Sequence, residues 1–102
     1  MMASLLAWKP LRRLPTLRGF AAVRLGESLK ISDIAIHAGN GRRWVMMPSR
    51  VLFNGNTVQL DERGKVRHVR VLEWLDPEAE AEFANAVLAA LEREHPGCTS
   101  AE

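Results

Sequence analysis

The residues whose types and spacing could do chemistry in this chain are arginines that surround a turn near its middle. Arg42 and Arg43 follow the turn Gly39-Asn40-Gly41, and Ser49 and Arg50 follow the next run of apolar residues. Guanidinium groups on a two-stranded ribbon can reach the phosphates of a nucleic acid and, in the major groove, the edges of its bases. The alternative is a solvated strand edge, at which arginines oppose the pairing of one sheet with another.

Three further basic residues extend the same hypothesis along the strand predicted over residues 66–75, with Lys65 directly before it and Arg67 and Arg70 within it. Binding through contacts of this kind would weaken steeply as the salt concentration rises. Trp44 lies between the arginines of the central stretch. We interpret it as a core or interface residue rather than as a platform on which bases stack.

Catalysis and metal binding find little support in the sequence. His37, His68 and His95 are far apart and lack the spacing of metal ligands. The one cysteine, Cys98, does not complete a zinc site with them and cannot form an internal disulfide. The segment Gly39-Asn40-Gly41 starts like a phosphate-binding loop but no helix is predicted after it. We therefore expect no enzyme activity, no cofactor and no metal ion.

The charges of the chain are unevenly distributed. Residues 1–75 hold 13 Lys and Arg against 5 Asp and Glu, whereas residues 76–102 hold 1 against 7. A basic body of this kind favours a polyanion as partner. The alternative is that the acidic C-terminal part folds over the basic part and neutralises it, and the sequence leaves both open.

Length and composition predict one ordinary globular domain. The chain has 102 residues, of which 47% are hydrophobic and 25% charged. A core of this size is thin and would gain from a dimer interface. No apolar run reaches the roughly 20 residues of a membrane span, and residues 4–8 are too short for the apolar part of a signal peptide. We expect a cytoplasmic protein without membrane contact.

Alternating apolar residues and turn residues predict a series of antiparallel strands. The turns are Gly26-Glu27-Ser28, Asn40-Gly41 and Asn54-Gly55-Asn56, and a further turn at residues 61–64 places Gly64 at a left-handed position. The predicted strands cover residues 17–25, 29–38, 42–47, 57–60 and 66–75.

Residues 1–16 carry two prolines and a basic cluster formed by Lys9, Arg12 and Arg13. Prolines at this spacing exclude a regular helix. We interpret the segment as a basic arm or a ragged terminus, with a short edge strand over residues 11–14 as the alternative.

The C-terminal part predicts one amphipathic helix. Asp76 is a good N-cap, Pro77 suits the first helical position, and His95-Pro96-Gly97 ends the helix. Its apolar stripe consists of Phe83, Ala84, Val87, Leu88 and Leu91. We expect residues 98–102 to be frayed. Antiparallel strands followed by one helix define an α+β domain, with the helix laid on one face of a meandering sheet.

A set of short motifs in the central stretch has the order found in one known family. The motifs are Asp33-Ile34, the apolar Ile36, Gly39-Asn40, Trp44-Val45 and Met47-Pro48-Ser49-Arg50. In this order they resemble the stage V sporulation protein G (SpoVG) family. The resemblance runs without gaps from about residue 22 to residue 50, which is under a third of the chain. The resemblance implies that residues 17–97 form a SpoVG-like domain.

The resemblance implies a small α+β homodimer whose sheet is joined across the dimer axis. Members of this family are bacterial regulators that bind DNA and, in some cases, RNA. The family's basic element after Met-Pro-Ser falls on Arg50, but Val51-Leu52-Phe53 follow where the family has a second basic residue and a turn. The resemblance therefore supports the family's fold and dimerisation for this chain more strongly than it supports DNA binding.

Together with this resemblance, the charge pattern predicts a small dimeric regulator that binds DNA or RNA with modest sequence specificity. Arg42, Arg43 and Arg50 would contact phosphates, and Ser49 would position the loop. The alternative is a protein-interaction module with no nucleic-acid partner, which recruits another protein through the acidic helix or a sheet edge.

Overall fold

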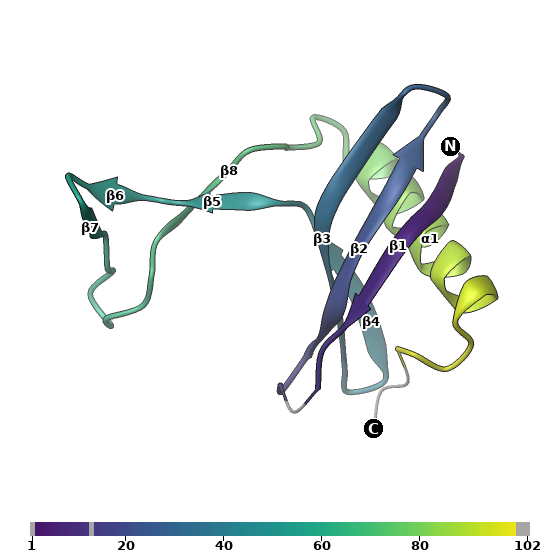
Figure 1. The fold of residues 1–102 in the computed structure, drawn as a ribbon, viewed down its shortest axis with the longest axis horizontal. Helices are drawn as coiled ribbons and strands as arrows, with labels where there is room; N and C mark the ends of the chain where they lie inside the picture. Colours follow the sequence, from purple (N-terminus) through teal and green to yellow (C-terminus); the bar gives the residue numbers. More distant parts are fainter. Residues whose placement is uncertain (1, 13, 100–102) are drawn as a thin grey trace.

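The computed structural model describes residues 2–12 and 14–99 as a four-stranded antiparallel sheet with one helix packed on it (Figure 1). The sheet order is β1-β2-β3-β4, so neighbours in sequence are neighbours in space. This arrangement confirms the predicted α+β fold. The elements are β1 (Ala3–Pro10), β2 (Leu17–Leu25), β3 (Leu29–Gly39), β4 (Arg42–Met46) and α1 (Pro77–Glu94).

The hairpin between β3 and β4 forms where the Asn-Gly turn predicts it. Asn40 and Gly41 have φ angles of 53° and 74°, the left-handed conformations that a two-residue hairpin turn requires. The pairing then fixes Gly39 opposite Arg42 and Ala38 opposite Arg43. Because side chains alternate along a strand, this register decides which face of the sheet each arginine occupies.

The helix begins and ends at the residues that the sequence predicts. The carboxylate of Asp76 accepts a hydrogen bond of 3.0 Å from the backbone N–H of Glu78, as an N-cap does. Pro77 occupies the first turn, where its missing N–H costs nothing. At the other end the backbone N–H of His95 donates to the carbonyl of Leu91 over 2.8 Å.

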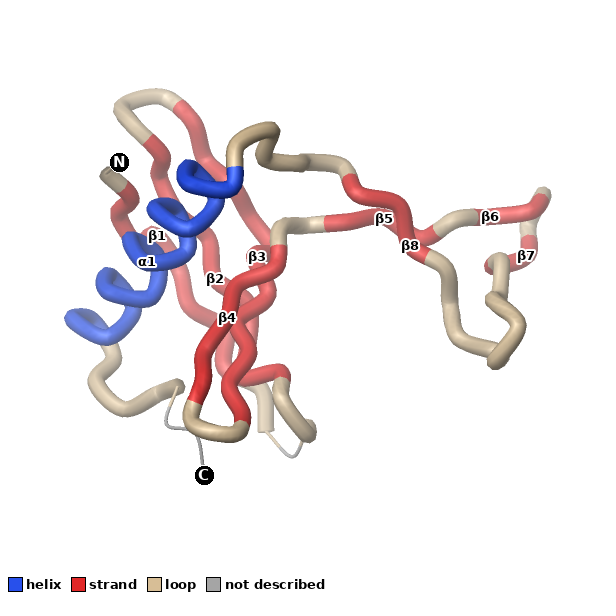
Figure 2. Tube along the Cα trace, turned by 180° about the vertical axis from the view of Figure 1, so that it is seen from behind, coloured by secondary structure: helices blue, strands red, loops and turns tan. Residues whose placement is uncertain are grey.

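The core lies between α1 and one face of the sheet, as the tube in Figure 2 shows from the helix side. Ile34 and Ile36 of β3 are fully buried there against the helix residues Phe83, Val87 and Leu91. Burial of large apolar side chains like these is the main favourable term in folding. None of the described residues forms a helix on the opposite face of the sheet, and we call it the open face.

Between β4 and α1 the chain leaves the body as a narrow projection, which we call the arm (residues 49–70). In it β5 (Ser49–Val51) pairs with β8 (His68–Arg70), and β6 (Phe53–Asn54) pairs with β7 (Thr57–Val58). The arm raises the radius of gyration to 14.8 Å, against about 13 Å for a compact chain of 100 residues.

Three predictions made from the sequence need correction. The N-terminal segment is not ragged, because residues 3–10 form edge strand β1, and that strand lies before residues 11–14, where an edge strand was expected. The strand predicted over residues 66–75 is regular only at His68–Arg70. Cys98 and Thr99 are not frayed, since Thr99 is 3% exposed. Arg13, which belongs to the predicted basic cluster, and residues 100–102, which belong to the predicted frayed tail, lie outside the described residues.

Candidate nucleic-acid interface

The four residues predicted to bind nucleic acid lie at two separate places. Arg42 and Arg43 begin β4 beside the hairpin turn, whereas Ser49 and Arg50 lie beyond its other end, at the root of the arm. At about 3.3 Å per strand residue, the part of β4 from Arg43 to Met46 that lies between them spans roughly 10 Å. The structure therefore does not bring the four residues together into one cluster.

Arg42 and Arg43 project from opposite faces of the sheet. The Nη1 atom of Arg43 lies 3.8 Å from Glu92 Oε2 on α1 and donates a 3.3 Å hydrogen bond to the hydroxyl of Thr99. The guanidinium of Arg42 instead lies 5.9 Å from the ring centroid of Trp44. Arg43 thus belongs to the helix side, and Arg42 is available on the open face.

At the root of the arm, Ser49 and Arg70 are opposite each other in the β5–β8 ribbon. The hydroxyl of Ser49 lies 3.4 Å from Nδ1 of His68 on the same ribbon face. Arg50 is opposite Val69 and points to the other face. The ribbon therefore presents cations on both of its faces.

The arm gathers basic residues that are scattered in the sequence. Five exposed cations lie on it, against the two acidic residues Asp61 and Glu62. The carboxylate of Asp61 accepts hydrogen bonds from two backbone N–H groups of its turn, at 2.8 and 2.9 Å, so it serves a structural role there. The five cations are Arg50, Arg63, Lys65, Arg67 and Arg70.

Aromatic side chains form a second feature, on the open face. The rings of His37 and Trp44 are stacked, with 5.3 Å between centroids and 5° between planes. A hydrogen bond of 3.0 Å joins Thr16 Oγ1 to His37 Nδ1 and fixes the ring. Burial and, to a lesser extent, the Arg18 guanidinium lower the pKa of His37 below its usual 6.5. Trp44 is half-buried and faces away from the helix-covered core, so it is not a residue of that core, and its predicted role at an interface stays a prediction.

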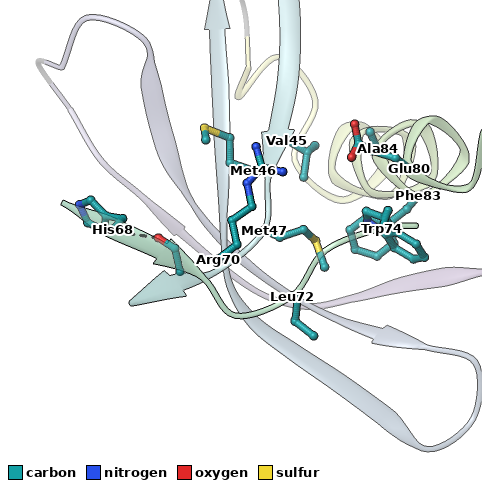
Figure 3. Close-up of a pocket in the computed structure, with 11 residues that line it drawn as sticks. Val45, Met46, Met47, His68, Arg70, Leu72, Trp74, Glu80, Phe83 and Ala84 are labelled. Atoms are coloured by element: carbon teal, nitrogen blue, oxygen red, sulfur yellow. Dashed lines mark hydrogen bonds between the residues drawn. The ribbon is translucent and has the colours of Figure 1, made fainter. Parts of the chain in front are cut away.

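A hollow of about 290 Å³ separates the arm root from the helix (Figure 3). Its apolar wall includes Met47, Trp74 and Phe83, and the rings of Trp74 and Phe83 lie 5.2 Å apart. Arg70 and Glu80 supply charge at its edge. The apolar wall of this hollow is continuous with the core.

The acidic helix lies close to one of the predicted contact residues. The helix reaches Arg43 through Glu92, so it neutralises one predicted contact. It packs on the face opposite Arg42, and its main contacts are with β1 and β4. The open face therefore lies on the side of the sheet opposite α1, whereas Glu80 of α1 shares the hollow at the arm root with Arg70.

Among residues 2–12 and 14–99, no group of three or more His, Cys, Asp and Glu side chains is placed to hold a metal ion. None of the helices in this part of the chain combines the length and apolar character of a membrane span. Comparisons of the sequence and fold with protein-family models, with curated proteins and with solved structures found no match.

Proposed function

We propose that this chain is a dimeric protein that binds DNA or RNA with modest sequence specificity. The observation that carries the proposal is the arm, a ribbon that stands away from the body and presents five exposed cations. The SpoVG-like motifs of the central stretch, which end at Arg50 on this same arm, support the proposal from the sequence side.

The shape of the arm fits a polyanion. A two-stranded ribbon is narrow enough to enter the major groove of DNA, where its side chains reach phosphates on both walls. Arg50 projects from one face of the ribbon and Arg70 from the other. A strand of phosphates on either side could therefore be contacted without a change in the backbone.

The apolar residues of the arm support dimerisation. Phe53, Leu60 and Val66 are 59%, 56% and 44% exposed. A ribbon of two strands that buries so little is marginally stable in water, so a second copy that covers these side chains would hold it in place. Edge strand β4 leaves one row of backbone groups available for joining two sheets.

The experiment is a fluorescence-anisotropy titration of labelled DNA and RNA over a series of salt concentrations. The test variant is Arg50→Gln/Arg67→Gln/Arg70→Gln, and the matched control is Arg24→Gln/Lys30→Gln/Arg93→Gln, which removes three exposed cations from the body. The arm variant should lower the slope of log K against log salt by about 2 to 3 for duplex DNA. Absence of binding at low salt, or an equal loss in both variants, would refute the assignment to the arm.

A second candidate function is a protein-interaction module. The same exposed apolar residues of the arm favour it, since patches of this kind mark protein contacts. A stoichiometric protein partner that co-purifies with the chain, with no nucleic acid in the preparation, would favour this candidate over the first.

A further inference from the structure

The open face of the sheet differs from an ordinary solvated sheet face. Register places Phe20 beside Ala35, Ala35 beside Met46, and His37 beside Trp44, all pointing away from the helix. Phe20, His37 and Trp44 are only partly buried, and Met46 is 51% exposed. Solvated sheet faces usually carry polar residues, so three rings and a methionine on this face need a separate explanation.

Two irregularities in the pairing of β2 with β3 frame Phe20. One lies between Leu17 and Gly19 and makes Arg18 the extra residue of β2. The other lies between Ala21 and Val23, and there β3 has the extra residue, with Asp33 at a φ of 58°. Bulges re-aim side chains, and left-handed residues other than glycine are concentrated at functional sites.

A hollow of about 590 Å³ lies on this face, between the sheet and the root of the arm. This volume is in the range of small-molecule sites. Its wall combines apolar and aromatic side chains with four polar ones that can donate or accept hydrogen bonds. The apolar residues are Leu17, Phe20, Ala35, Met46, Met47 and Pro48, and the polar residues are Asp33, His37, Ser49 and His68.

We propose that this hollow binds an unpaired base of a single-stranded nucleic acid, stacked on the ring of Phe20 or His37, with the Asp33 carboxylate accepting a hydrogen bond from an amino group of the base. The proposal rests on the proposed function and specifies which form of nucleic acid the protein prefers. A base in a duplex is held between its neighbours and cannot enter a hollow, whereas a base in a single strand can be splayed out and stacked on an aromatic side chain.

Charge complementarity supports this occupant over a second copy of the chain. Lys9 lies opposite Phe20 on β1, Arg18 is close enough to His37 to lower its pKa, and Arg42 lies over Trp44. These cations can hold the phosphates on either side of the bound base. An apolar residue of a partner's arm would leave the Asp33 carboxylate without a hydrogen-bond donor, which is unfavourable in a closed contact.

The same carboxylate predicts a base preference. Asp33 can accept from the amino groups of cytosine, adenine and guanine, whereas uracil presents a carbonyl at the position of the cytosine amino group. We expect oligocytidine to bind more tightly than oligouridine of equal length, because the two differ at that position.

The test uses anisotropy titrations of the full chain with a labelled 12-nucleotide oligocytidine, an oligouridine and a mixed-sequence strand, alone and paired with its complement. Phe20→Leu keeps an apolar side chain but removes the ring, and should weaken single-strand binding about ten-fold while duplex binding stays unchanged. Asp33→Asn should reduce the preference for cytidine over uridine. Leu29→Ala, which shortens an exposed apolar side chain at the start of β3, outside the lining of the hollow, is the matched control and should leave single-strand binding unchanged.

The outcomes separate this inference from the proposed function. Duplex binding equal to single-strand binding, or no effect of Phe20→Leu, would refute the base site while leaving nucleic-acid binding by the arm intact. No binding of any probe would refute both. If Phe20→Leu turned a dimer into a monomer in sedimentation, the hollow would be an interface between copies, and the base site would be wrong. Circular dichroism of each variant checks that the fold is retained.

Discussion

The imidazole of His37 lies parallel to the indole of Trp44, with 5.3 Å between ring centroids. Burial, and then the charge of Arg18, lower the pKa of this histidine below 6.5. The folded state therefore takes up the proton less readily than the unfolded state. Well above pH 6.5 the His37 ring is neutral in both the folded and the unfolded state. The free energy of unfolding should decrease as the pH falls through 6.5 and then through the lowered pKa of the folded state.

Urea denaturation at pH 7.5 and pH 5.5 measures this loss. His37→Gln removes the ionisable ring, so the difference in unfolding free energy between the two pH values should shrink. An unchanged difference in the variant would assign the pH dependence to other groups.

Arg42 and Arg43 offer a test with a built-in control, because they are adjacent in sequence but face opposite sides of the sheet. Arg42 lies on the open face over Trp44, and Arg43 is engaged by Glu92 and Thr99. Arg42→Ala should lower single-strand affinity and reduce the salt slope by about 0.7, whereas Arg43→Ala should change neither. Equal losses in the two variants would mean that nucleic acid approaches the hairpin tip from both sides.

Removing the ion pair of Arg43 should matter little for stability. Both side chains are nearly half exposed, at 42% and 48%, and exposed ion pairs contribute about 0 to 1 kcal/mol. Thermal denaturation of Glu92→Gln should therefore give a melting temperature close to that of the parent chain. A large decrease would show that the contact orders residues 98–99 more strongly than its exposure implies.

Asp33 should be needed for binding but not for folding. Its φ of 58° is a conformation that glycine adopts without strain. Asp33→Gly should leave the free energy of unfolding within about 1 kcal/mol of the parent value, because the relieved strain offsets the entropy that glycine loses on folding. The preference for oligocytidine should disappear in the same variant, and a preference that survived would exclude the carboxylate from base recognition.

Local signals in the sequence were sufficient for the hairpins and the helix. The Asn40-Gly41 turn and the Asp76 cap each act through the backbone of a few neighbouring residues, and both were predicted correctly. The N-terminal strand was missed because Pro10 argues against a ladder, although an edge strand tolerates a proline at its end. Its pairing with β2 depends on contacts distant in sequence.

The arm could not be predicted from alternation alone. Residues 66–75 alternate imperfectly and have the composition of a sheet strand, yet the regular strand is limited to His68–Arg70, with an isolated bridge from Val66 to Leu60. Their partners lie in the arm rather than in the main sheet. The candidate site, too, could be predicted only in part from the sequence. The sequence marks Arg42, Arg43, Ser49 and Arg50, but it contains no signal that a bulge at Asp33 and a hollow beside Phe20 lie on the same face.

The contrast between Phe83 and Leu75 tests the division between core and exposed linker. Phe83 is 1% exposed and packs against Trp74, whereas Leu75, just before the helix, is 99% exposed. Phe83→Ala leaves a cavity in the core and should cost about 3 to 5 kcal/mol, a large part of the stability of a domain this small. Leu75→Ser should change the unfolding free energy by less than about 0.5 kcal/mol. Urea denaturation at low protein concentration measures both, and a large loss in Leu75→Ser would show that a second copy covers this side chain even in dilute solution.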